Sequence, residues 1–233
     1  MLAAAGGIVA SAAGLMAYGV RGRSSSIFGP SVYRGRRDAN NIAITFDDGP
    51  TPATLHLLDV LARYSVKATF FQCGIQVRRH PEIARAVHAA GHEIGNHSAT
   101  HPLLSFRSPK FIFEELRSAQ EAIGEAVGIA PVLFRAPYGV RWFGLREAQR
   151  KLNLLGVMWT MLGRDWALPR VAIERRILGN ARGGDIICLH DGRETQNAPD
   201  IRNTIEAVSG VVPVLLDRGV HFKTVSELLC QTN

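Results

Sequence analysis

The sequence predicts an α/β domain with parallel strands, preceded by an apolar N-terminal segment. Beyond residue 40, short apolar runs alternate with longer amphipathic ones, which is the pattern of strands joined by helical crossovers. The chain has 233 residues, of which 46% are hydrophobic, so one sizeable core in a single domain is expected. Seven strand and helix units fit either an open sheet or a barrel.

The elements are expected in the following order. Each expected strand is short and apolar, and each expected helix places apolar residues at helical spacing. The expected strands are 41–46, 66–72, 92–96, 132–135, 155–160, 185–190 and 220–223. The expected helices are 53–64, 81–90, 109–127, 141–152, 169–178 and 200–217, with a last helical turn at 224–229.

Residues 1–22 form the apolar N-terminal segment, and residues 2–20 carry no charge. Nineteen residues at a rise of ~1.5 Å just cross a bilayer, so a membrane anchor, a signal peptide and a buried helix are all open. No Lys or Arg precedes the segment, which disfavours a signal peptide. Residues 23–40 contain a serine run, a Gly-Pro pair and an arginine cluster, and they predict a basic linker.

The net charge of +7 is unevenly distributed. Residues 1–40 hold five Arg against one Asp, which gives +4 and leaves +3 for the rest of the chain. No basic helix with interleaved aromatic residues occurs, so a nucleic-acid partner is not expected. The three cysteines make no disulfide framework; Cys73 and Cys188 end apolar runs and are expected to be small core residues.

Two motifs carry most of the chemistry. The first expected strand ends in Asp47 and Asp48, which precede a Gly-Pro turn. Neighbouring strand residues point to opposite faces, so the two acids can serve different purposes at one site. About fifty residues later come His97 and His101, which can converge on one metal ion if their stretch makes a helical turn. Taken alone, turn-forming acids and capping histidines are the simpler interpretation.

Together with three later motifs, these residues resemble the polysaccharide deacetylases, also described as the NodB homology domain or carbohydrate esterase family 4. The resemblance covers residues 41–229 and implies a distorted (β/α)7 barrel. Most of the matched polar residues fall at or beyond the ends of expected strands, the face that carries the chemistry in α/β barrels. The later motifs are Arg135-Ala136-Pro137-Tyr138, Asp165-Trp166 and Leu189-His190-Asp191, and the stretch 91–97 is also typical.

The resemblance implies a metal centre with an acid and a base. Asp48, His97 and His101 are the expected ligands of a divalent metal, with Zn²⁺ first and Co²⁺ or Ni²⁺ as alternatives. Asp47 is expected to be the general base and His190 the general acid.

Five further positions are expected to support this chemistry. Arg135 is expected to orient the catalytic aspartate, and Asp165 to hold the arginine or tune the histidine, although an ordinary salt bridge is the alternative. Tyr138 is expected to offer its backbone N–H to the oxyanion. Trp166 and Leu189 are expected to wall an acetyl pocket or to be plain core. The sequence departs from the fuller family pattern at Leu162, where some members carry another acid.

The implied activity is metal-dependent removal of N-acetyl groups from amino sugars of peptidoglycan or a chitin-like glycan. An O-acetyl esterase acting on xylan-type polysaccharide is the alternative enzyme, and a catalytically inactive glycan-binding protein or a membrane scaffold is the alternative of another class. The expected partners are an N-acetylated glycan and a membrane contacted through residues 2–20. We expect an envelope protein, membrane-anchored or exported. Its orientation is open, because the arginines favour a cytoplasmic domain whereas family precedent favours the outside.

Overall fold

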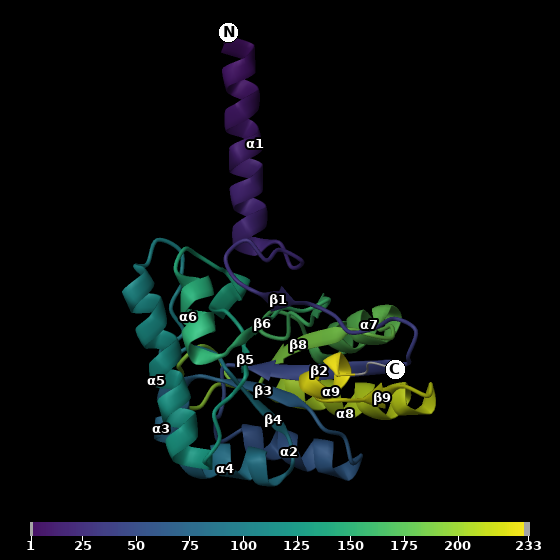
Figure 1. Cartoon of the computed structure of the whole chain (residues 1–233). Helices are drawn as coiled ribbons and strands as arrows, with labels where there is room; N and C mark the ends of the chain where they lie inside the picture. The colour runs from purple at the N-terminus through teal and green to yellow at the C-terminus, as the bar shows by residue number, and fades with distance from the viewer. Residues whose placement is uncertain (1, 231–233) are drawn as a thin grey trace.

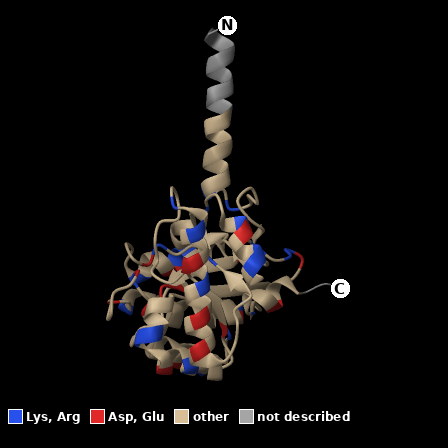
Figure 2. Cartoon of the chain, turned by 60° about the vertical axis from the view of Figure 1, so that its left-hand side comes forward, with Lys and Arg blue, Asp and Glu red and all other residues tan. Residues whose placement is uncertain are grey.

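A curled sheet of parallel strands forms the centre of the molecule, with helices packed around it and helix α1 (Leu2–Arg21) projecting from one side (Figure 1). This is a computed structural model that describes the backbone of residues 2–230 and the side chains of residues 12–230. Residues of both charges are interspersed over the domain (Figure 2).

The sheet runs in the order β1-β6-β5-β4-β3-β2-β8-β7, with β9 paired to the start of β2. Every pairing between these described strands is parallel. The predicted distorted barrel is therefore confirmed as a curled half-barrel whose path ends at β1 and β7. The strands are β1 (Ser31–Val32), β2 (Asn41–Asp47), β3 (Thr69–Gln72), β4 (Glu93–Asn96), β5 (Leu133–Phe134), β6 (Leu155–Val157), β7 (Met161–Leu162), β8 (Ile186–His190) and β9 (His221–Phe222).

The helices begin and end where the local sequence supplies capping groups. In α5 the Ser108 side chain accepts a hydrogen bond from Phe111 N, and Gly128, with φ 74°, follows the last turn. In α9 the Thr224 and Glu227 side chains form a reciprocal capping box. Besides α1, the helices of the described chain are α2 (Thr54–Arg63), α3 (Gly74–Arg79), α4 (Pro81–Ala89), α5 (Pro109–Val127), α6 (Leu145–Leu152), α7 (Arg170–Asn180), α8 (Arg202–Asp217) and α9 (Val225–Leu229), with a 3-10 turn at Pro137–Gly139.

The two faces of strand β2 contact different parts of the molecule. Its residues Ile42, Ile44 and Phe46 are fully buried in the main core, which also takes apolar residues from α2 and α8. Alternation along the strand turns Thr45 and Asp47 to the opposite face. The apolar residues thus anchor the strand, and the polar ones are presented at the site.

The seven predicted strands correspond to β2, β3, β4, β5, β6, β8 and β9. The sequence reasoning missed β1, β7 and α3. Strands β1 and β7 have two residues each, too few for a period to show. Helix α3 has six residues and directly follows β3.

The segment predicted as a basic linker, residues 23–40, packs against the domain. Its strand β1 pairs with β6, and Phe28 is 6% exposed with its ring against Trp142 and Phe143. The buried Arg141 donates its backbone N–H to Val20 O over 3.1 Å and its guanidinium to Gly22 O and Ser25 O. The segment is thus held by the sheet, by aromatic packing and by hydrogen bonds.

Among the residues that the structure describes, no helix is both long and apolar enough to cross a membrane. The predicted anchor at residues 2–20 falls largely on positions whose side chains are outside the described residues. The membrane anchor therefore stays a prediction.

Candidate active site

The polar side chains of interest lie at the carboxyl ends of neighbouring parallel strands. Strands β2 and β8 pair so that Asp47 lies opposite His190. Strand β4 ends one residue before His97, and β5 ends one residue before Arg135. Because parallel strands end at the same edge of a sheet, the fold gathers these four residues at one face.

The turn after β2 positions Asp48. The backbone of Asp48 has φ 79°, which takes the chain out of the strand at that residue. The next amide, Gly49 N–H, donates to Asp191 Oδ1 over 3.1 Å, and Thr54 Oγ1 donates to Asp191 Oδ2 over 2.7 Å. Burial raises the pKa of Asp191 to about 7. Asp191, to which the sequence assigned no role, therefore fixes the turn that carries Asp48.

Asp48, His97 and His101 converge as a candidate metal centre. Asp48 Oδ1 lies 3.3 Å from His97 Nε2 and 3.1 Å from His101 Nε2. Two ligand atoms at the usual ~2.0–2.1 Å from a tetrahedral ion are roughly 3.3 Å apart, so these separations fit one ion. Asp48 Oδ1 is also buried without a hydrogen-bond donor, which is the state expected of a ligand oxygen.

The electrostatics keep these donors in the form that a cation needs. Burial acts to raise the pKa of Asp48, but the neighbouring imidazoles of His101 and His97 hold it well below its usual range. His97 Nδ1 lies 2.8 Å from Arg135 O. Donation from Nδ1 to that carbonyl leaves Nε2 free to bind a metal.

The two imidazoles do not converge through a helical turn, so that part of the prediction is wrong. Residues 97–101, all within the described chain, form a bend in which Ser98 has φ 64° and His101 φ 57°. Buried Glu115 of α5 holds the bend, since it accepts the amides of Ala99 and Thr100 over 3.1 and 2.9 Å. A carboxylate from a distant helix thus sets the histidine spacing.

Asp47 is paired with a buried arginine. Arg135 is 0% exposed and donates from Nη1 to Asp47 Oδ1 over 2.7 Å. The same nitrogen donates to Thr45 Oγ1 over 2.7 Å, and the guanidinium lies 4.1 Å from the centre of the Phe71 ring. The arginine is therefore fixed in place, and it orients Asp47 through Oδ1. The other oxygen, Oδ2, faces the Cys188 thiol.

The partner of Asp165 is His190. Arg135, which was the other expected partner, contacts Asp47 instead. His190 Nδ1 lies 2.8 Å from Asp165 Oδ1, and the His190 amide donates to Asp165 Oδ2 over 2.9 Å. Burial acts to lower the pKa of His190, but the Asp165 charge and hydrogen bond raise it to about 9. Of the two contacts expected for Asp165, the structure shows the one with the histidine.

A cavity of about 790 Å³ joins these groups, within the range of ligand pockets. It is lined by the three candidate metal ligands, Asp47 and His190, and its walls include Tyr138 and Trp166. Leu189 is 0% exposed and packs in the main core, so the structure places it behind the cavity, and Arg135 and Asp165 likewise lie below the surface.

Glu194 and Arg21 are among the cavity residues to which the sequence assigned no role. Glu194 accepts a hydrogen bond from Tyr138 Oη over 2.9 Å, and its backbone N–H donates to Asp48 Oδ2 over 2.8 Å. Arg21, at the end of α1, also lines the cavity. Both contacts join segments far apart in the chain, and neither residue lies in a motif that could have indicated them.

Fold and site place the chain among α/β enzymes that work at the carboxyl edge of a curled parallel sheet and can bind a divalent metal there. The sequence pattern that defines the polysaccharide deacetylases matches residues 34–157. The chain is 38% identical over 197 residues to a chitooligosaccharide deacetylase of a Bradyrhizobium species, covering 81% of this chain and 90% of the relative. This chain belongs to the polysaccharide deacetylase family, as the sequence motifs predict.

Two further comparisons agree. A peptidoglycan-N-acetylglucosamine deacetylase of Bacillus cereus is 38% identical over 192 residues, covering 81% of this chain and 87% of the relative. The crystal structure of a peptidoglycan N-acetylglucosamine deacetylase superposes with a TM-score of 0.81 at 27% identity, covering 87% of this chain and 94% of that one. The relatives are thus hydrolases of acetylated glycans.

Proposed function

We propose that this protein removes N-acetyl groups from amino sugars of a glycan, releasing acetate. The named relatives act on chitooligosaccharide and peptidoglycan, which supports peptidoglycan or a chitin-like oligomer as the substrate. The observation that carries the proposal is the shared cavity, in which a set of metal donors lies beside two separately paired acid–base groups.

Asp48, His97 and His101 would hold the metal, and Zn²⁺ suits two imidazoles and one carboxylate, with Co²⁺ or Ni²⁺ as alternatives. When bound, a divalent ion of this kind activates a water molecule and polarises the carbonyl group that the water attacks. The shared Oδ1 contact of Asp48 with both Nε2 atoms supports this assignment.

Asp47 acts as the general base in this proposal. Arg135 holds Oδ1, which keeps the carboxylate oriented and leaves Oδ2 to take a proton from the attacking water. The water oxygen then forms its bond to the acetamide carbon. The backbone N–H of Tyr138 faces the developing oxyanion, and Trp166 contacts the acetyl methyl group.

His190 acts as the general acid. Its raised pKa, about 9, keeps the ring protonated at neutral pH, and Asp165 fixes Nδ1 so that Nε2 is directed away from the carboxylate. Nε2 gives its proton to the amine nitrogen as the carbon–nitrogen bond breaks. The products are acetate and a free amino sugar.

The test is acetate release by the full-length protein on chitooligosaccharides, peptidoglycan fragments and acetylated xylan, each with Zn²⁺ and with a chelator. Asp47→Asn serves as the matched control with an intact metal site. Chelator-sensitive release from the first two substrates, absent in the variant, is the expected result. Release from xylan alone would identify an O-acetyl esterase, and no release with glycan bound would identify an inactive binding protein.

We also propose that the protein works at the cell envelope, reached by export or by an anchor at residues 2–20. The peptidoglycan substrate named for one relative supports this location. Separation of cells into soluble and membrane fractions tests the anchor, since a variant lacking residues 2–18 should leave the membrane fraction.

A further inference from the structure

Cys188 lies next to both proposed acid–base groups and takes no part in the proposed reaction. It is two residues before His190 on β8, so the two side chains share a face of the strand. Its Sγ lies 3.4 Å from Asp47 Oδ2. Cys188 is 1% exposed but borders the catalytic cavity, so a small ion in the cavity can contact the sulfur.

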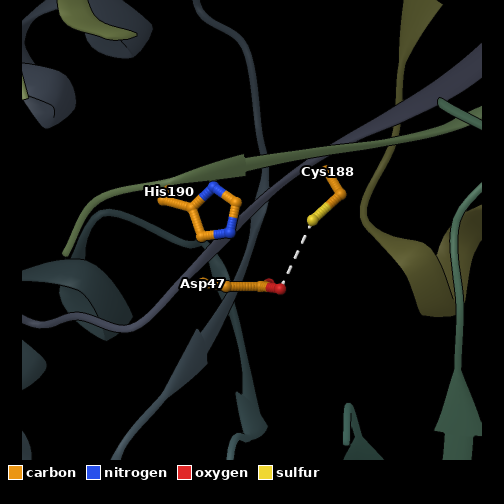
Figure 3. A group of neighbouring side chains, drawn as sticks. All are labelled: Asp47, Cys188 and His190. Carbon is orange, nitrogen blue, oxygen red and sulfur yellow. Dashed lines mark hydrogen bonds between the residues drawn. The ribbon is translucent and has the colours of Figure 1, made fainter. Parts of the chain in front are cut away.

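The donors of these three residues are spaced like metal ligands. One donor atom from each of Asp47, Cys188 and His190 lies within 4.8 Å of the others. A sulfur at ~2.3 Å and an oxygen at ~2.0 Å from a tetrahedral zinc are roughly 3.5 Å apart, close to the observed 3.4 Å. In Figure 3 the outer ring nitrogen of His190 is turned toward the other two side chains.

The surrounding groups complete the arrangement. Arg135 occupies Asp47 Oδ1, and the Cys188 thiol donates to Oδ2, a hydrogen bond that the ion would replace. Asp165 occupies His190 Nδ1, which gives the carboxylate–histidine pairing that commonly orients a metal-binding imidazole through its other nitrogen. A carboxylate and a thiolate together balance the charge of a divalent cation. The sulfur favours thiophilic cations over Mg²⁺ or Ca²⁺.

We propose that Asp47, Cys188 and His190 form a second metal site, which binds Zn²⁺ or Cd²⁺ in excess and thereby inhibits the enzyme. The inhibitory part rests on the proposed function, because the ion takes the oxygen of the base and the nitrogen of the acid. On binding, the Cys188 thiol and the His190 ring each lose a proton to solvent, and the ion replaces both. This site shares no ligand with the Asp48, His97 and His101 centre and lies beside it, since Asp47 Oδ2 is 4.0 Å from His97 Nε2.

The test titrates Cd²⁺ or Zn²⁺ into full-length protein already loaded with one equivalent of Zn²⁺. Two readouts are independent of activity: ions bound per chain by equilibrium dialysis, and the ultraviolet charge-transfer absorption of a cadmium–thiolate bond. The third readout is acetate release at each metal concentration, divided by the release of the same variant without added metal. Cys188→Ala and the similarly sized Cys188→Ser are compared with Cys230→Ser, which changes an exposed cysteine, and thermal melts establish that each variant folds.

The expected result is that wild type and Cys230→Ser bind a second ion, show the thiolate band and lose activity, whereas both Cys188 variants lose the band. Their half-inhibitory concentration should rise at least about tenfold, because a ligand is gone. Mg²⁺ should not inhibit any form. Unchanged binding and inhibition in both folded Cys188 variants would overturn the proposal. A Cys188-dependent second ion in a protein without acetate release would overturn the proposed function and leave the metal site standing.

Discussion

Replacing Asp165 with asparagine asks whether His190 serves as an acid because of its carboxylate partner. Asp165→Asn keeps the size of the side chain and an oxygen for the 2.8 Å contact with Nδ1, but it removes the charge. That charge is the main opponent of burial, which by itself lowers the pKa of His190. The variant therefore removes the charge of Asp165 together with the hydrogen bonds that its Oδ2 accepts from the His190 amide and Thr204 Oγ1.

The size of the effect follows from the two pKa values. At about pH 7.5 a histidine with a pKa of about 9 is almost fully protonated. If the pKa falls to the ordinary 6.5 or below, at most about a tenth of the rings carry the proton. Turnover at that pH should fall roughly tenfold or more. In the pH profile of acetate release, the decline on the alkaline side should move down from about pH 9.

The assay is the pH profile of acetate release at saturating substrate, with bound metal measured for each protein. Asp200→Asn is the matched control, because it makes the same chemical change in an exposed carboxylate that is paired with Arg202, and its profile should coincide with wild type. An alkaline limb that stays at the same pH in Asp165→Asn would refute the assignment of that limb to His190 and Asp165.

The same shift has a consequence for stability. The folded pKa of His190, about 9, exceeds the ordinary 6.5, so this pair stabilises the fold fully below about pH 6.5 and the contribution is lost as pH rises through about 9. Its size is on the order of 3 kcal/mol. Urea unfolding of metal-free protein at about pH 6 and about pH 10 measures it, and the loss should be absent in Asp165→Asn.

Three other substitutions test the site and the docked N-terminal segment. Asp48→Ala should abolish both bound metal and acetate release, since it deletes one of three donors; retained metal with full activity would contradict the ligand set. Asp47→Asn should keep the metal but lose ~10²–10⁴ in turnover, and normal turnover would exclude it as the base. Phe28→Ala should lower the free energy of unfolding by about 3–5 kcal/mol, against less than about 0.5 kcal/mol for the 86% exposed Phe106→Ala.

Much of the fold was predictable because strands β2 and β8 are long enough to show their character. Both are continuous apolar runs that end in polar residues, so their ends and the polar positions beyond them could be predicted from pattern alone. The strands that were missed have two residues each. They exist because neighbouring strands offer them backbone partners, which is information that lies elsewhere in the chain.

The site was predictable in its members and less so in its geometry. Motifs indicated Asp48 and the two histidines, but the bend that brings the imidazoles together depends on Glu115, a residue of a helix whose periodicity gives no sign of a polar role. Leu189 illustrates the reverse case. It belongs to a motif, yet the strand's alternation turns it into the core.

The attachment of the N-terminal segment has a mechanical consequence. A flexible chain of eighteen residues, the length of 23–40, would have a mean end-to-end distance of roughly 20–25 Å and would let the domain rotate freely at its end. Here the contacts of Phe28 and Arg141 prevent that rotation. Arg21, the last residue of α1, is part of the cavity wall. Any contact that fixes the orientation of α1 in the cell therefore also fixes the direction in which the cavity opens.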